Sequence, residues 1–309
     1  MRPGSEAVEW NLASTQSFRR YAWGVLAYNL GVVLWGAYVR ATGSGAGCGN
    51  HWPLCNGAIT PPSPTTATLI EFTHRVSSGL DLVLVAVLVW WAFRAFPRGH
   101  RVRRGAVFSA VFLTSEALIG AMLVLLQQVA RNASVARAYS LSAHLVNTLT
   151  LLACLTLTAW WSAPPRREEK VAAGDGTRGV WLMAASFGLV MLLGISGAIA
   201  ALGDTLFPAR SLAAGLAQDF DPTANVFLRL RGLHPLIAGI TGAWLVWFAV
   251  WMARRRPQAQ NRAWMLGVLV GVQLSAGLMN LLLLAPVWMQ MVHLLLADLV
   301  WISLVVLCA

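Results

Sequence analysis

Charged side chains are scarce in this chain: they make up 11% of its 309 residues, whereas 57% of the residues are hydrophobic. A soluble domain of this length does not need so much apolar surface, so the shortage of charge excludes an ordinary water-soluble fold. Several apolar runs exceed the roughly 18–20 residues that span a bilayer. The first run is too long for a removed signal peptide and lacks the small-residue cleavage site of one. The composition therefore predicts a multi-pass protein embedded in a lipid bilayer.

The apolar runs predict an all-α integral membrane protein with eight transmembrane helices. We expect these spans at about residues 20–39, 69–93, 105–129, 139–161, 179–201, 228–253, 263–284 and 286–308.

Acidic residues are also few, 12 against 23 basic ones, which leaves a net charge of +11. Such an excess can indicate nucleic-acid binding, but here it is concentrated in the N-terminal tail and in the loops after spans two, four and six. Sixteen of the 23 basic residues lie there: Arg2, Arg19, Arg20, Arg94, Arg98, Arg101, Arg103, Arg104, Arg166, Arg167, Lys170, Arg178, Arg254, Arg255, Arg256 and Arg262. The positive-inside rule then places both termini in the cytoplasm. We expect these clusters to contact lipid headgroups of the plasma membrane, and we expect no nucleic-acid partner.

The two halves of the chain resemble each other. A polar, Pro/Gly-rich stretch at residues 162–178 has the composition of a linker, and it divides the chain into halves 1–165 and 166–309. The matched positions, each about 160 residues apart, are Gly36 and Gly197, His74 and His234, Gly79 and Gly239, and the stretches 115–120 and 273–277. Since four spans per half keep the same orientation, the repeat is parallel. It predicts two pseudo-symmetric four-helix bundles.

Four histidines, His74, His144, His234 and His293, lie near the outer ends of spans two, four, six and eight. In hydrocarbon an imidazole is costly unless it has a partner or a ligand. Each is expected about 5–8 residues inside its span, roughly 8–12 Å deep. Two histidines on facing helices at equal depth can take both axial positions of a haem iron. Hydrogen-bonded structural histidines are the alternative; zinc is disfavoured because the chain has no H-E-x-x-H or C-x-x-C motif.

The two predicted sites differ in their flanking residues. Glu71 precedes His74 by three residues and lies on the same helix face, whereas Arg231 holds the corresponding place in the second half. Arg75 follows His74, but Pro235 follows its counterpart and is expected to start or kink the helix. An acid beside the iron suits proton handling, and a site without one suits electron transfer. We therefore assign the chemistry to the first half.

Other polar groups have simpler interpretations. Glu116, Asp298 and Asp81 lie within spans, where helix–helix hydrogen bonding is favoured over proton relay. His51 and His100 are expected to be solvated loop residues.

Only two of the four cysteines, Cys48 and Cys55, lie outside the spans, in the first outer loop. Because that loop faces an oxidising compartment, a disulfide is the simplest state for them, and a thiol pair held for metal binding is the alternative. Cys154 and Cys308 lie inside spans and are expected to be small core residues.

The loop from Gly36 to Gly57, with its T-G-S-G, Cys48 and W-P-L-C-N-G segments, is followed by an E-x-x-H-R motif and three further helix-borne histidines. In these features nearly the whole chain resembles the haem A synthase family. The resemblance implies oxidation of a ring methyl group of haem O to a formyl group, which gives haem A for aa3-type terminal oxidases. It implies roles for two sets of residues: Glu71, His74 and His144 at the substrate haem, and His234 and His293 at a resident haem b. It also matches Cys48 and Cys55 to a disulfide pair that some members carry.

The chain departs from the family pattern at Gly49-Asn50-His51 and at Pro235. Both departures bear on how haem propionates are held near the outer face. Candidates for pairing with propionates are Arg40, Arg75, Arg229 and Arg231. Each could equally anchor the protein at the membrane interface.

Two other function classes use the same histidines. One is a cytochrome b-like electron carrier with two permanent haems, and the other is a haem transporter or chaperone. The latter is disfavoured because the first outer loop has a single tryptophan, Trp52, and the second, from Asp204 to Phe227, is sparse. The family resemblance implies haem O synthase and terminal oxidase assembly as partners.

Overall fold

The computed structural model describes residues 12–164 and 176–309. Within these ranges the chain is helical, with no strand and a single isolated bridge between Cys55 and Ala58. In the described part of the chain, eight segments are long and apolar enough to span a membrane. The prediction of an all-α protein with eight spans is confirmed. Part of the predicted linker, and with it the boundary at 165 and the basic residues Arg2, Arg166, Arg167 and Lys170, lies outside the described residues.

The helices are α1 (Leu12–Ala41), α2 (Thr66–Ala95), α3 (Arg101–Leu125), α4 (Val135–Trp161), α5 (Gly176–Leu206), α6 (Leu212–Phe220), α7 (Val226–Arg231), α8 (His234–Arg255), α9 (Gln260–Leu282) and α10 (Val287–Cys308). Their starts follow local capping rules. The side chains of Thr65, His100 and Ser134 each accept a hydrogen bond from a backbone N–H of the turn that follows, which satisfies a donor that has no partner inside the helix.

The helices and loops differ from the predictions in two places and confirm the expectation for Pro235. The third span ends at Leu125 instead of 129, because Gln127 adopts a positive φ that no α-helix accommodates. The sixth span lies at Val226–Arg255, close to the predicted residues, and it breaks at Gly232 into α7 and α8. Pro235 occupies the first turn of α8, so the expectation that it starts or kinks a helix is confirmed. The second long loop is not sparse, since it carries the helix α6.

His100 is not a purely solvated loop residue. Its ring accepts a hydrogen bond from the backbone N–H of Val102 at 3.2 Å and stacks on Phe96 with ring centroids 4.8 Å apart. Burial lowers the pKa of His100, and the neighbouring charges of Arg101 and Arg103 lower it further. His100 therefore acts as a neutral cap of α3.

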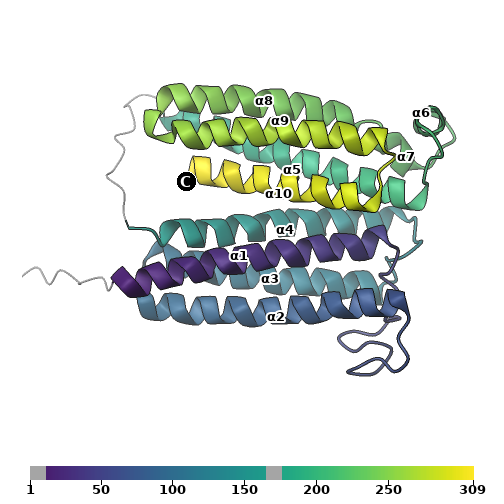
Figure 1. Cartoon of the computed structure of the whole chain (residues 1–309), viewed down its shortest axis with the longest axis horizontal. Helices are drawn as coiled ribbons and strands as arrows, with labels where there is room; N and C mark the ends of the chain where they lie inside the picture. The colour runs from purple at the N-terminus through teal and green to yellow at the C-terminus, as the bar shows by residue number, and fades with distance from the viewer. Residues whose placement is uncertain (1–11, 165–175) are drawn as a thin grey trace, which may run out of the picture.

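The long helices run side by side, with α1–α4 in one group and α5, α8, α9 and α10 in the other (Figure 1). In the first group each helix contacts its neighbour in the order α1, α2, α3, α4 and back to α1. In the second the order is α5, α8, α9, α10 and back to α5. Helices α2 and α4 are thus diagonal to each other, and so are α8 and α10.

The two groups meet through α4, which packs against α5 and α10, and through α1, which packs against α10. Leu152, Leu155, Trp301 and Leu304 are buried there. The indole N–H of Trp301 donates a hydrogen bond to the carbonyl of Leu149 at 2.7 Å. This contact joins the two halves in the middle of the molecule.

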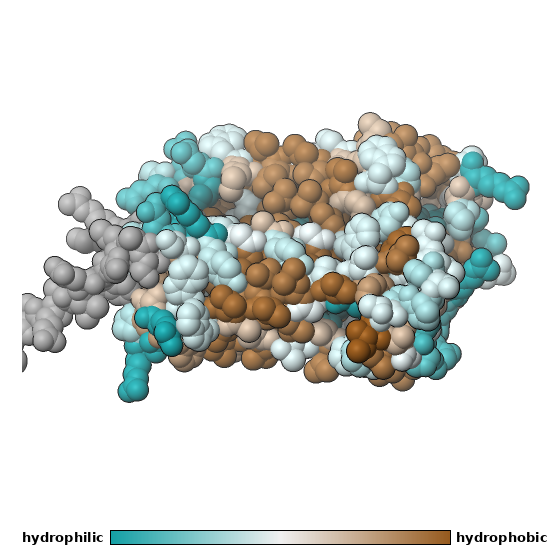
Figure 2. All heavy atoms as spheres, turned by 60° about the horizontal axis from the view of Figure 1, so that its bottom comes forward, coloured by the Kyte–Doolittle hydropathy of each residue, from teal (hydrophilic) through white to brown (hydrophobic). Residues whose placement is uncertain are grey.

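The surface of the molecule carries a broad apolar band between two hydrophilic ends (Figure 2). Large exposed apolar side chains such as Phe108, Val111, Trp264 and Val268 belong to the long helices. Lipid rather than water is the natural neighbour of such a band. The chain is therefore a multi-pass membrane protein.

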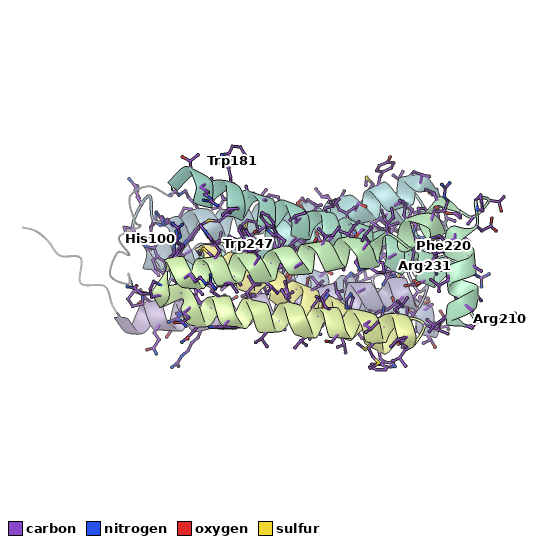
Figure 3. All side chains as sticks on the ribbon, turned by 90° about the horizontal axis from the view of Figure 1, so that it is seen from above. His100, Trp181, Arg210, Phe220, Arg231 and Trp247 are labelled. Atoms are coloured by element: carbon purple, nitrogen blue, oxygen red, sulfur yellow. A yellow bond between two sulfur atoms is a disulfide. The ribbon has the colours of Figure 1, made fainter. Side chains whose placement is uncertain are left out.

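The first long loop, residues 42–65, lies at the same end of the molecule as α6 and α7, and the C-terminus lies at the opposite end (Figure 1). Arg210, Phe220 and Arg231 lie at the loop end, far from His100 and Trp181 (Figure 3). Side chains near the first turns of α2, α4, α8 and α10 therefore face a common end.

Candidate functional site

The four histidines lie near the loop end of the molecule in two pairs. His74 is on α2 and His144 on α4, and these two imidazoles are close enough for their charges to interact. His234 is the first residue of α8 and interacts in the same way with His293 on α10. In each pair the histidines come from diagonal helices of one four-helix ring. The structure thus brings together the pairs that the sequence repeat predicts.

Three of the four imidazoles rest against a glycine of a neighbouring helix. A Cβ atom built on Gly36 would lie 2.9 Å from Cε1 of His74, and one on Gly277 would lie 2.9 Å from Cε1 of His293. At Gly197 the corresponding distance to Cε1 of His234 is 3.1 Å. Any larger residue at these positions would push the ring away. The glycines therefore set where the rings lie.

The polar partners of the rings leave nitrogen atoms available for a ligand. The Nδ1 atoms of His74 and His293 are buried without a hydrogen-bond partner. Nδ1 of His234 lies 2.9 Å from the hydroxyl of Ser196, which leaves its Nε2 open. A buried imidazole nitrogen without a partner is unfavourable unless something binds it. Two imidazoles on diagonal helices of each ring are the kind of donor set that holds a haem iron.

The donor set does not resemble other metal centres. Within the described residues no group of three or more His, Cys, Asp or Glu side chains could hold a metal ion. Structural and catalytic zinc sites need three or four such ligands. The arrangement of two histidines per site therefore favours haem over zinc.

Glu71 is buried one turn before His74 and ties α2 to the first long loop. One carboxylate oxygen accepts a hydrogen bond from the backbone N–H of Cys48 at 2.9 Å, and the other accepts one from Arg75 at 2.5 Å. Arg75 also donates to the carbonyls of His51 and Leu54, both at 2.7 Å. The acid and its neighbour thus hold the loop over the site of His74.

Cys48 and Cys55 form a disulfide, with their Cα atoms 4.4 Å apart. Both are buried although the loop around them is largely exposed. The bond closes the part of the loop whose backbone contacts Glu71 and Arg75. The predicted disulfide is confirmed.

Three of the arginines predicted to pair with propionates are engaged by protein groups, and Arg75 is one of them, through Glu71 and the loop carbonyls. Arg40 of α1 donates to the carbonyl of Ala201 at 2.8 Å, the hydroxyl of Thr205 at 2.9 Å and the side-chain oxygen of Gln290 at 3.0 Å. These contacts join the first half to α5 and α10.

Arg231 makes ion pairs with Asp204 at 3.1 Å and with Asp219 of α6 at 2.7 Å. It fixes α6 over the end of α5 instead of standing open beside His234. A propionate would have to share these partners or replace them.

Sequence reasoning did not assign a role to Ser196, Asn147, Gln273 or Gln290. Ser196 lies one residue before Gly197 and contacts His234, and Gln273 contacts His293. The alignment of Gly120 with Gly277 could have found one of them. In that alignment Gln273 corresponds to Glu116, because Gly277 and Gly120 are 157 residues apart and so are Gln273 and Glu116 (277 − 120 and 273 − 116).

The chain is similar to known proteins over most of its length. A family model described as "Cytochrome oxidase assembly protein" (COX15-CtaA) matches residues 19–305. Two proteins named "Protoheme IX farnesyltransferase", from two strains of Thermus thermophilus, are 50% and 49% identical over 289 residues, which is 92% of this chain and 47% of theirs. The chain thus spans about half the length of these relatives.

Proteins named "Heme A synthase" match shorter stretches. The one from Geobacillus kaustophilus is 46% identical over 93 residues, covering 30% of this chain and 29% of its own. The one from Halalkalibacterium halodurans is 35% identical over 134 residues, covering 43% and 44%.

Proposed function

The chain belongs to the COX15-CtaA family of cytochrome oxidase assembly proteins, and we propose that it acts as a haem A synthase. In this proposal haem O is the substrate, and one of its ring methyl groups is oxidised to a formyl group. The product supplies aa3-type terminal oxidases. The observation that carries the proposal is the difference between the two sites. Each has two histidines on diagonal helices, but a buried carboxylate, Glu71, lies one turn from a histidine of the first site only.

At the first site we assign His74 and His144 to hold the substrate haem from its two faces. Glu71 stands beside them as the group that takes or gives a proton at the reacting edge. The first long loop, fastened through Cys48 and Arg75, covers this region and limits the access of water. Each of these roles is a property of this chain's own side chains.

At the second site His234 and His293 would hold a resident haem b, which supplies electron transfer when bound. Ser196 fixes the orientation of the His234 ring, and Arg231 ties the neighbouring loop helix in place. No buried acid takes the place of Glu71 here, since Arg231 lies at the matching position.

We further propose that the halves 1–165 and 166–309 are two pseudo-symmetric four-helix bundles with both termini in the cytoplasm. The two closed rings of helix contacts support the bundles. The exposed arginines Arg98 and Arg254 belong to the end opposite the long loops, which supports the orientation. The haem sites would then lie near the outer face of the plasma membrane.

The name "Protoheme IX farnesyltransferase" belongs to proteins of which this chain spans 47%. The proteins named "Heme A synthase" match stretches of this same chain. We therefore assign the farnesyl transfer to the part of those relatives that this chain does not match. In such an arrangement the enzyme that produces haem O would be joined to the enzyme that uses it. We therefore propose a haem O synthase as a partner of this chain, together with the terminal oxidase during its assembly.

The test is haem extraction and chromatography on the protein purified after co-expression with a haem O synthase, beside a His74→Ala variant. We expect haems B, O and A in the wild type, and haem B without haem A in the variant. Haem B alone in both proteins would contradict the proposal. A di-haem electron carrier would then be the better account.

A further inference from the structure

Glu116 of α3 lies against the second histidine of the first site. Its Oε1 atom is 3.1 Å from Nδ1 of His144. This distance is within hydrogen-bond range, but Nδ1 of His144 does not make a hydrogen bond, so the contact is a close approach of an imidazole and a carboxylate. Within the described residues this is the one close pair of a histidine and a carboxylate.

The carboxylate is held in place by α4, the helix that bears the histidine. Asn147 donates to one of its oxygens through its amide and Thr148 to the other through its hydroxyl. Asn147 is itself fixed, since it accepts a hydrogen bond from Ser115 at 2.6 Å and donates to the carbonyl of Phe112 at 2.9 Å. Glu116 therefore meets the ring from a fixed position.

The second site has no such anionic neighbour among the described contacts of its rings. Gln273, which matches Glu116 in the repeat, places its amide nitrogen 3.4 Å from Nε2 of His293. The other ring, that of His234, meets the hydroxyl of Ser196 at 2.9 Å. Both partners are neutral. The repeat thus places a carboxylate beside one histidine and its uncharged isostere beside the corresponding one, with Glu116 at Nδ1 of His144 and Gln273 at Nε2 of His293.

A carboxylate that accepts the N–H of a ligating histidine fixes the tautomer and orientation of the ring and makes the other nitrogen a stronger donor. A stronger donor favours the oxidised metal over the reduced one, which lowers the reduction potential. A neutral amide or hydroxyl has a weaker effect, because it carries no charge.

We propose that Glu116 is a positioning residue for His144 that lowers the reduction potential of the first site relative to the second. This inference rests on the proposed function in that it takes both sites to hold haem. With Glu116 at Nδ1, Nε2 of His144 would be the nitrogen that holds the iron, and the neutral Gln273 would leave the second site at the higher potential. A haem bound at the second site would then be the better electron acceptor of the two. The difference between Glu116 and Gln273 at matching positions of the repeat would thereby give the two sites different reduction potentials.

The experiment compares the haem-loaded wild type with three variants, Glu116→Gln, Gln273→Glu and Ser115→Ala. All four proteins are purified after co-expression with a haem O synthase. The readouts are the midpoint potential of each haem and the low-spin electron paramagnetic resonance spectrum of its ferric form. The His74→Ala and His293→Ala proteins assign each signal to its site.

We expect Glu116→Gln to raise the potential of the first-site haem and leave the second unchanged. Gln273→Glu should lower the potential of the second-site haem only. Ser115→Ala removes a contact within the same cluster but keeps the carboxylate, so it should move neither potential. Equal shifts at both sites, or no shift in Glu116→Gln, would overturn the inference. If Glu116→Gln fails to fold, the Gln273→Glu variant alone tests the inference. An unchanged second-site potential in that variant would then overturn the inference.

This outcome is separable from that of the proposed function. If the wild type makes no haem A, but the first-site potential of Glu116→Gln differs from that of the wild type, the proposed synthase activity is refuted and the role of Glu116 stands. If the wild type makes haem A and Glu116→Gln does not change the first-site potential, the synthase activity stands and the role of Glu116 is refuted.

Discussion

At the residue scale, the smallest side chains determine the position of the histidines. His74, His234 and His293 each lie against a glycine on a neighbouring helix, at distances where a methyl group would displace the ring. His144 has no such neighbour, because a Cβ on Gly120 meets nothing within 4 Å. Its position depends on Glu116 instead. Steric contact therefore places three rings and a charge places the fourth.

This difference gives a matched pair of substitutions. Gly277→Ala forces His293 from its place, and overpacking of this kind costs about 1–3 kcal/mol. We expect roughly a tenfold or larger loss of second-site haem occupancy, measured by pyridine haemochrome content per chain. Gly120→Ala, at the corresponding position of the first half, should retain full occupancy. Equal loss in the two variants would contradict the role given to Gly277.

Glu71 supplies a second prediction at this scale. Glu71→Gln keeps an oxygen to accept the N–H of Cys48 but removes the charge that pairs with Arg75. The loop should stay in place while the proton-transferring group is lost, so haem A formation should fall about 100-fold or more. Total haem per chain should stay as in the wild type, and chromatography of extracted haem measures both. Wild-type haem A in this variant would refute the role of Glu71.

At the element scale, the halves are joined by side chains from helix ends as well as by apolar packing. Arg40, in the last turn of α1, reaches α5 and α10 with three hydrogen bonds. Gln290, one of its partners, lies one turn before His293 on α10. The end of α1, which also carries Gly36 against His74, is thus linked directly to the helix of the second site.

Arg40→Leu should loosen this joint. It leaves the carbonyl of Ala201 and the side chain of Gln290 without their charged donor, and hydrogen bonds to charged groups each contribute about 1.5–3 kcal/mol. We expect a lower midpoint of thermal unfolding in detergent, followed by loss of the haem absorbance. Arg210→Leu is the control, because Arg210 is exposed and points away from the molecule at the same end (Figure 3). Equal midpoints for the two variants would show that Arg40 does not join the halves.

At the scale of the whole molecule, an apolar band separates an end with long loops from an end with the C-terminus and several arginines. The proposed orientation places the loop end outside the cell. Both sites then lie near the oxidising side, where the disulfide of Cys48 and Cys55 is stable.

Thiol labelling of intact cells tests the orientation. Ile59 is 81% exposed in the first long loop, and Arg98 is exposed at the opposite end. In a background where Cys154 and Cys308 are replaced by Ser, a membrane-impermeant reagent should label Ile59→Cys in intact cells. It should label Arg98→Cys only after the cells are opened. The opposite pattern would reverse the proposed topology.

The sequence by itself determined the eight spans and the repeat that relates the histidines of the two halves. Apolar runs long enough to cross a bilayer can fold only as helices that satisfy their own backbone hydrogen bonds, so span number follows from hydropathy alone. The match of His74 with His234 follows from the repeat, which needs no coordinates. The break before α8 was also predictable, because Pro235 cannot continue a helix from the preceding turn.

Only the tertiary structure decided which polar side chains meet across helices. Contacts such as those of Glu116 with His144, Ser196 with His234 and Arg40 with Gln290 join residues that are 28 to 250 positions apart. Each depends on how far every helix is rotated about its own axis and on where its neighbours cross it. When nearly every face of a helix is hydrophobic, its apolar pattern specifies neither quantity. The pattern then does not distinguish the face that contacts lipid from the face that contacts another helix. The positions of the acids and glycines around the rings were therefore settled only when the helices packed.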